Sequence, residues 1–160
     1  MRTDRILIEN WEPTGGQWNY DKENRKFDKN HKKSWNFTLE KNFFVAEAEE
    51  FYDYKMPFLH PSNREEALNL LDYFIKNHLN NFGRLEDAMY SHDNYVHHSL
   101  LSSSINFWFI SPREVVKKVE SADSAMNNKE GFIRQVLGWR EYMYHFFLSY
   151  KDTIYSKNYF

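Results

Sequence analysis

The chain has no cysteine and few of the residues that break regular structure, with five glycines and four prolines among 160 residues. Without cysteine it can form no disulfide and can offer no thiolate to zinc or to an iron–sulfur cluster. No apolar run approaches the ~20 residues of a membrane span. Residues 1–15 lack the apolar centre of a signal peptide. We therefore expect a cytoplasmic protein with no membrane partner.

Strong charge of one sign is also missing, since the net charge is −2, and this argues against the whole chain being a general polyanion binder. The charge is nevertheless uneven. Basic residues gather between Lys22 and Lys33, and acidic residues between Glu47 and Asp53. The basic run could meet phosphates, and a solvated linker explains it as well.

Aromatic residues are what the chain has in abundance, at 19% of the sequence. Side chains of this kind recur where planar ligands or other flat surfaces are packed. They also simply fill protein cores. Composition leaves both interpretations open.

The first 37 residues show no sustained period of apolar residues. Gly15-Gly16 is a turn signal, and Trp18, Phe27 and Trp35 are scattered among charged residues. We predict an extended arm over residues 1–37, whose aromatic side chains dock on another surface. Residues 5–8 alone could form a short strand.

From residue 38 onward the apolar spacing is helical. Capping boxes at Ser62-Asn63-Arg64-Glu65 and Ser111-Pro112-Arg113-Glu114 predict two helix starts, and Phe82-Gly83 predicts a helix end. The expected helices cover about 38–51, with Thr38 as the cap, then 62–82, 96–106, 111–122 and 128–148. The predicted fold class is all-α, with one helical domain over residues 38–160.

Several familiar catalytic and binding motifs are absent. Gly15-Gly16 lacks the further glycines and the lysine of a phosphate-binding loop, and nothing builds a nucleophilic triad. His92, His97 and His98 are close in sequence, but no acidic or sulfur ligand stands at helical spacing beside them. We expect no metal site.

Two segments combine polar and aromatic groups on expected helices. Residues 97–104 place hydroxyls and backbone N–H groups at a helix start, which suits a phosphate or merely caps the helix itself. Residues 130–142 carry Gly138 within a helix, at a cost of about 1 kcal/mol relative to alanine. Close approach by a ligand or another helix is the usual reason for such a glycine. Trp139 could stack on a flat ring, while Arg140 and Glu141 could simply pair with neighbouring helices.

Four blocks follow one another along the sequence. They are Phe82-Gly83-Arg84-Leu85-Glu86-Asp87-Ala88-Met89, His98-Ser99-Leu100-Leu101-Ser102, Ile110-Ser111-Pro112-Arg113-Glu114-Val115, and Glu130-Gly131-Phe132-Ile133-Arg134-Gln135-Val136-Leu137-Gly138-Trp139-Arg140-Glu141-Tyr142. These blocks and their order resemble the photolyase/cryptochrome family, most closely its bacterial (6-4) photolyase-like branch with an iron–sulfur cluster. Upstream, residues 15–25 resemble the interdomain linker of that branch, between its antenna-binding domain and its helical domain.

The resemblance implies a helical domain that binds FAD beside a DNA-binding face. Members of the family use light-excited reduced FAD to repair UV-damaged DNA, or act as blue-light sensors. By this resemblance His98 would act near the flavin or the lesion, and the cofactor would be held by Ser99, Leu101, Ser102, Gln135, Trp139 and Arg140. The iron–sulfur cluster of the branch cannot be built from a chain without cysteine.

The sequence departs from the family at two residues, with Leu85 where a tyrosine is usual and Trp108 where a glycine is usual. The resemblance also implies that residues 38–160 are part of a helical FAD-binding domain, without the antenna domain and the later helices. We therefore expect weak or no flavin binding and no repair by the chain alone. Two alternatives are a helical interaction module that complements a separately encoded remainder, and a nonfunctional remnant.

Overall fold

The structure is a computed structural model that describes residues 6–20, 22, 24–40, 43–53, 60–154 and 156–157. It is mostly helical, which confirms the predicted all-α class. Within the described residues, strand structure is limited to an antiparallel pair, β1 (Ile8–Glu9) and β2 (Glu12–Pro13). The strand expected at residues 5–8 overlaps this pair only at Ile8, and Arg5 lies outside the described residues.

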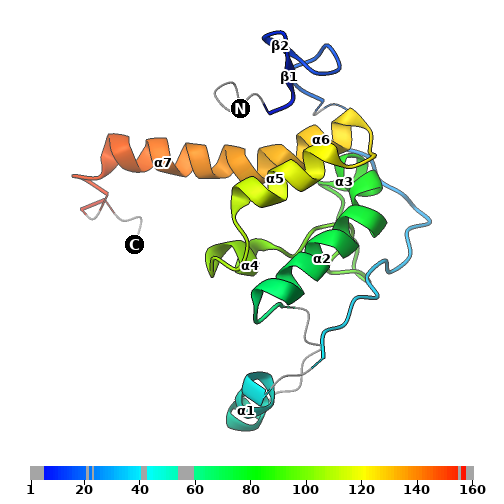
Figure 1. Ribbon diagram of the computed structural model, residues 1–160, viewed down its shortest axis with the longest axis vertical. Helices are drawn as coiled ribbons and strands as arrows, with labels where there is room; N and C mark the ends of the chain where they lie inside the picture. The colour runs from blue at the N-terminus through cyan, green and yellow to red at the C-terminus, as the bar shows by residue number, and fades with distance from the viewer. Residues whose placement is uncertain are drawn as a thin grey trace.

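The helices follow in one series from the middle of the chain to its end (Figure 1). Their bounds are α1 Phe43–Tyr52, α2 Arg64–Asn77, α3 Leu79–Leu85, α4 Ser102–Asn106, α5 Pro112–Ser121, α6 Met126–Ile133, η2 Arg134–Gly138 and α7 Trp139–Tyr150. The segment η2 is a single π-helical turn, and it joins α6 and α7 into one continuous rod.

The hydrophobic core lies between α2, α3, α5 and the first half of that rod. Phe74 is fully buried in α2, and its ring lies 4.7 Å from that of Phe132 in α6 and 6.0 Å from that of Phe82 in α3. Val115, Val116 and Val119 of α5 are buried against the same cluster. The apolar spacing of α2 and α5 therefore points one stripe of each helix inward, as expected for amphipathic helices.

Helix α3 crosses α6 so closely that two glycines meet. A Cβ atom on Gly83 would lie 2.8 Å from the backbone oxygen of Asn127, and one on Gly131 would lie 3.7 Å from the Cα of Gly83. Our prediction that Gly83 ends a helix is wrong, because Gly83 lies inside α3. The glycine serves close packing between two helices rather than termination.

The two predicted capping boxes have different outcomes. At α5 the box is present as expected, with Ser111 as the N-cap, Glu114 reaching back and Pro112 at the first helical position. At α2 the cap is one residue later than predicted, because Asn63 accepts the N–H of Glu66 and Ser62 donates to the Glu66 carboxylate.

The helix that we predicted over residues 96–106 begins later in the structure. Only Ser102–Asn106 is helical, because Val96 and Leu100 have positive φ angles of 46° and 57°, which a helix does not allow. The Asp93 carboxylate stabilises the turn before this point by accepting the backbone N–H of Val96. A local side-chain hydrogen bond thus competes with the helix.

The first and last predicted helices are right in kind and shifted in their bounds. The first begins at Phe43 and not at a Thr38 cap, since residues 38–40 are not helical. The last covers Met126–Tyr150, slightly longer than 128–148, and contains the π turn η2 that the sequence pattern did not indicate.

Part of the arm before α1 packs onto the helical core. Trp35 is 5% exposed and stacks on the ring of His78, at a centroid distance of 4.2 Å. Asn24 is also buried, whereas Trp18 and Phe27 are largely exposed. The chain therefore runs alongside α2 and α3 before it reaches α1 (Figure 1).

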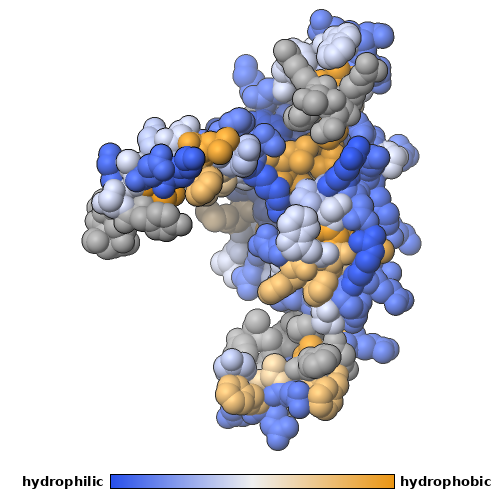
Figure 2. Space-filling view, turned by 60° about the vertical axis from the view of Figure 1, so that its left-hand side comes forward, coloured by the Kyte–Doolittle hydropathy of each residue, from blue (hydrophilic) through white to orange (hydrophobic). Residues whose placement is uncertain are grey.

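Helix α7 projects away from this core. None of its twelve residues, all of them described, is buried. The projecting helix carries hydrophobic patches on its surface (Figure 2). No helix in the described part of the chain is long and apolar enough to cross a membrane.

Candidate functional site

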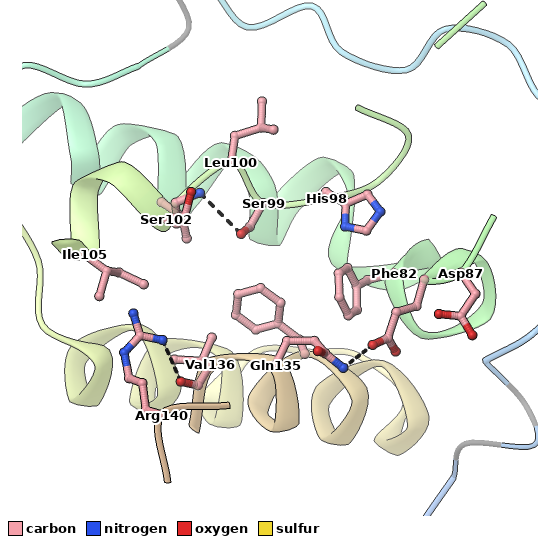
Figure 3. A pocket seen from close by; sticks show the side chains of 13 residues that line it. Phe82, Asp87, His98, Ser99, Leu100, Ser102, Ile105, Gln135, Val136 and Arg140 are labelled. Atoms are coloured by element: carbon pink, nitrogen blue, oxygen red, sulfur yellow. Dashed lines mark hydrogen bonds between the residues drawn. The ribbon is translucent and has the colours of Figure 1, made fainter. Parts of the chain in front are cut away.

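A cavity of about 470 Å³ lies between α3, the segment leading into α4, and the rod formed by α6, η2 and α7. Its floor is apolar, with Phe82 and Phe132 side by side at a ring distance of 5.3 Å. Polar side chains from both walls face the cavity (Figure 3). A concave site with an apolar lining and a few polar groups is the usual form of a small-molecule site.

The cavity brings together six of the seven side chains predicted from the sequence. They come from segments more than thirty residues apart in the chain. The six are His98, Ser99, Leu101, Ser102, Gln135 and Arg140. The seventh, Trp139, does not line the cavity; it follows Gln135 by one helical turn and is 62% exposed.

The two ends of the cavity differ in charge. Arg140 and Ser102 lie at one end, close to Ile105 (Figure 3). Asp87 and His98 lie at the other end, where Glu86 also lines the wall. A guanidinium beside hydroxyl groups suits an anion such as a phosphate, and carboxylates suit a group that donates hydrogen bonds.

The π turn η2 sets the directions of the side chains on the rod. Arg140 donates from Nη1 to the carbonyl oxygen of Val136 at 2.8 Å, which ties its side chain to the turn. Trp139 donates from Nε1 to Oε1 of Gln135 at 2.7 Å. Single π turns within α-helices occur frequently at functional sites.

The adjacent histidines point to opposite sides of the segment before α4. His98 faces the cavity, where desolvation by the surrounding protein lowers its pKa and the Asp87 carboxylate acts in the opposite direction. His97 is buried on the other side, with its Nδ1 3.1 Å from Nδ1 of His78. The described residues contain no group of three or more side chains placed to hold a metal ion.

His97 belongs to a buried cluster where the arm meets the core. His31 from the arm lies 2.7 Å from the Asp93 carboxylate through Nε2, and its ring contacts that of His97 edge-on at 5.6 Å. Burial lowers the pKa of both His78 and His97 to about 4. These two imidazoles are therefore neutral at pH 7, and this cluster is separate from the cavity.

The carboxylates of the cavity are site residues that we did not predict from the sequence. Glu86 and Asp87 both line it, and both stand in the first of the four blocks that carried the resemblance. Neither residue was assigned a role from the sequence. One partner of Glu86 is Gln135, which is 49 residues away and donates its amide Nε2–H to the carboxylate.

The two departures from the family pattern lie outside the cavity. Leu85 is buried in a small cluster with Ala88 and Val96, so it leaves the cavity wall unchanged. Trp108 is 80% exposed, in the turn after α4, with a φ angle of 61°. This backbone region favours glycine, so an exposed tryptophan there is strained.

The sequence is similar to proteins of the photolyase class. A sequence model of the family described as "Deoxyribodipyrimidine photo-lyase-related protein" matches residues 1–54. A (6-4) photolyase from Agrobacterium fabrum (strain C58) is 35% identical over 157 residues, which cover 89% of this chain and 31% of the photolyase. The predicted relationship to the photolyase family is therefore confirmed.

A second similar protein comes from a giant virus. The uncharacterized protein R853 of Acanthamoeba polyphaga mimivirus is 39% identical over 83 residues, which cover 47% of this chain and 60% of that protein. The chain thus spans about a third of the curated photolyase and less than two thirds of the viral protein.

Proposed function

We propose that the cavity is part of an FAD site to which the chain alone binds weakly, and that the parent function of the protein is that of the photolyase family, light-driven repair of UV-damaged DNA or blue-light sensing. The observation that carries the proposal is the convergence of His98, Ser99, Leu101, Ser102, Gln135 and Arg140 on one cavity. The resemblance implies these same residues, and they come from two distant segments of the chain.

The side chains present suit the cofactor in their chemistry. Arg140 with the hydroxyls of Ser99 and Ser102 would hold a phosphate. Phe82, Phe132 and Val136 offer apolar surface to a ring. Reduced FAD would supply the electron for repair when excited by light, while the protein positions and tunes it.

Damaged DNA is the partner that the relationship supports. The curated relative is named as a (6-4) photolyase, and repair of a base within a duplex requires the base to be turned out into a pocket. His98 at the acidic end of the cavity would then lie near the flavin or the lesion. Residues 1–37 would form the linker arm, and residues 38–160 part of the helical FAD-binding domain.

A titration of FAD against the purified chain, followed by flavin fluorescence and visible absorbance, tests the proposal. Removing the anion-binding groups with Ser99→Ala and Ser102→Ala together, or with Arg140→Gln, should weaken binding about tenfold or more, the equivalent of losing a charge-assisted hydrogen bond. Ser103→Ala is the matched control, because Ser103 is in the same helix and does not line the cavity.

Saturable binding that weakens only in the cavity variants would support a flavin site in this chain. A folded chain that does not bind FAD at millimolar concentration would contradict flavin binding by the chain alone. The alternatives would then be a remnant without function or a protein that works together with another polypeptide.

Association with another polypeptide is a second candidate function, favoured by α7. Trp139, Tyr142, Phe146 and Tyr150 recur along this helix and are each at least 37% exposed. Exposed apolar surface of this kind marks interaction sites. Such a partner would be a separately encoded remainder of the photolyase fold, and co-purification of the chain with that remainder would test this candidate.

A further inference from the structure

Three side chains beside the cavity form a continuous series of hydrogen bonds. Trp139 donates its indole N–H to the amide oxygen of Gln135 at 2.7 Å. Gln135 in turn donates its amide N–H to the carboxylate of Glu86. The series links the end of α3 to the first residue of α7 through the π turn η2.

The hydrogen-bonding groups of Trp139 and Glu86 fix the orientation of the Gln135 amide that lies between them. An indole N–H can only donate, and an ionised carboxylate can only accept. The amide of Gln135 must therefore turn its nitrogen toward Glu86 and its oxygen toward Trp139. If Glu86 were absent, the amide could rotate by half a turn, and its NH₂ group would then face the indole N–H.

We infer that Glu86 is a positioning residue, which holds the indole of Trp139 through the amide of Gln135. The use of such positioning rests on the proposed function, because a fixed indole beside the cavity presents a flat ring for stacking against a planar ligand. Neither Glu86 nor its effect on Trp139 follows from the spacing of residues in the sequence.

Glu86 is itself held in place by the arm. Asn24 is 2% exposed and donates from Nδ2 to Oε2 of Glu86 at 3.3 Å, while Gln135 donates to Oε1. The space for this contact exists because residue 131 is glycine. A Cβ atom there would lie 2.8 Å from Nδ2 of Asn24 and 3.2 Å from Oε2 of Glu86.

The test is a two-dimensional ¹⁵N–¹H spectrum of the indole groups in the full chain, with the Trp139 signal assigned by Trp139→Phe. Glu86→Ala should shift the Trp139 indole resonance upfield and speed the exchange of its proton with water. Asp87→Asn is the matched control for charge, because it removes the neighbouring carboxylate that makes no contact with Gln135 in the hydrogen bonds described. It should leave the Trp139 signal in place.

Exchanging the side chains of Glu86 and Gln135 distinguishes positioning through hydrogen bonds from simple packing. Gln135→Glu alone places two carboxylates together and should also shift the signal. Glu86→Gln combined with Gln135→Glu restores these three hydrogen bonds: the new amide accepts from Asn24 and donates to the new carboxylate, and that carboxylate accepts the indole N–H. The double variant should return the Trp139 resonance to its original position.

Each result decides the question. An unmoved Trp139 signal in folded Glu86→Ala, or no recovery in the double variant, would overturn the inference. If Glu86→Ala does not fold, the unchanged chain gives the answer, because a Trp139 indole proton that exchanges as fast as that of free tryptophan contradicts the hydrogen bond. The spectra need no ligand, so failure to bind FAD would refute the proposed function and leave this inference standing.

Discussion

The rod from Met126 to Tyr150 has two halves with opposite surroundings, and α7, the half richer in apolar residues, is the exposed one. In α6 the residues Gly131, Phe132 and Ile133 are buried against α3 and α2. In α7 every residue is at least partly exposed, although the helix carries aromatic side chains at almost every turn. The difference shows that burial here is decided by the neighbours of a helix and not by its own hydrophobicity.

The aromatic residues also fall into a buried group and an exposed group. Phe74, Phe82 and Phe132 form a buried group with ring distances of 4.7 to 6.0 Å. On α7 the ring of Tyr142 lies 6.2 Å from that of Phe146, and the contact is open to solvent. Of the two interpretations that composition left open, core filling applies to the first group and a surface for another molecule fits the second.

The largest expected effect is a difference in stability between these two groups. Phe74→Ala should lower the free energy of unfolding by about 3–5 kcal/mol, because it leaves a cavity in the core. Phe146→Ala should change it by less than about 0.5 kcal/mol, as is usual for a surface position. Urea unfolding followed by circular dichroism measures both.

Equal losses of unfolding free energy for Phe74→Ala and Phe146→Ala would contradict the expected difference between the buried and the exposed aromatic groups. That result would mean that the α7 face is covered in solution, and the unfolding midpoint would then depend on protein concentration if a second copy of the chain covers it.

A second effect concerns the buried histidines where the arm meets the core. His78 and His97 have pKa values of about 4 in the folded chain, below the ordinary 6.5. The unfolded chain therefore binds more protons between pH 6.5 and 4, and stability is complete above this range and is lost as the pH falls through it. The loss is on the order of 2 kcal/mol per imidazole between pH 7 and 5.

Unfolding curves at a series of pH values test this expectation. His97→Gln should flatten the slope between pH 6.5 and 4, since one of the two buried imidazoles is gone. The Asp93 carboxylate, whose pKa desolvation would raise but the hydrogen bond from His31 and backbone N–H groups together lower to about 2, should act only in more acidic solution. A slope unaffected by His97→Gln would show that His97 is not buried in solution.

The glycines of the rod and of α3 provide a third, smaller contrast. Gly83→Ala should destabilise the chain by about 1–3 kcal/mol, because the new methyl group would lie 2.8 Å from a backbone oxygen of α6 that cannot move alone. Gly138→Ala has no atom within 4 Å of its Cβ. It should be neutral or stabilising by up to about 1 kcal/mol.

Thermal unfolding of the two alanine variants distinguishes them. A loss at Gly138 as large as that at Gly83 would indicate that something approaches the rod at the start of α7 in solution. In that event the glycine of the fourth block would serve a close contact, as the sequence analysis proposed.

The sequence allowed prediction of local chemistry better than of tertiary contacts. The capping box at Ser111 could be recognised because all of its groups lie within four residues. Gly83 was misinterpreted because its reason lies in α6, more than forty residues later. The helix expected from Val96 failed because an Asp93 hydrogen bond and positive φ angles outweigh the apolar spacing.

In the candidate site, too, tertiary contacts could not be predicted from the sequence. The segments 98–102 and 135–140 could be selected from the resemblance, and the structure brings six of those seven side chains to one cavity. Their roles in binding remain predictions. Glu86 could not be selected, because its meaning depends on Gln135 in another helix.

The smallest expected effect concerns the exposed aromatic pair after α4. Trp108 has a φ angle of 61° and contributes little to the core, since it is 80% exposed. Trp108→Gly should therefore relieve backbone strain and change stability by less than about 1 kcal/mol, in the stabilising direction, after allowance for the greater freedom of glycine in the unfolded chain.

The neighbouring residue supplies the control. Phe107 is 72% exposed but has an ordinary φ angle of −85°, so Phe107→Gly gains no relief of strain and should be destabilising. Thermal unfolding of both glycine variants gives the comparison. If Trp108→Gly lowered the midpoint as much as Phe107→Gly, the indole would be making contacts in solution, and the exposed aromatic surface would extend from α7 to this turn.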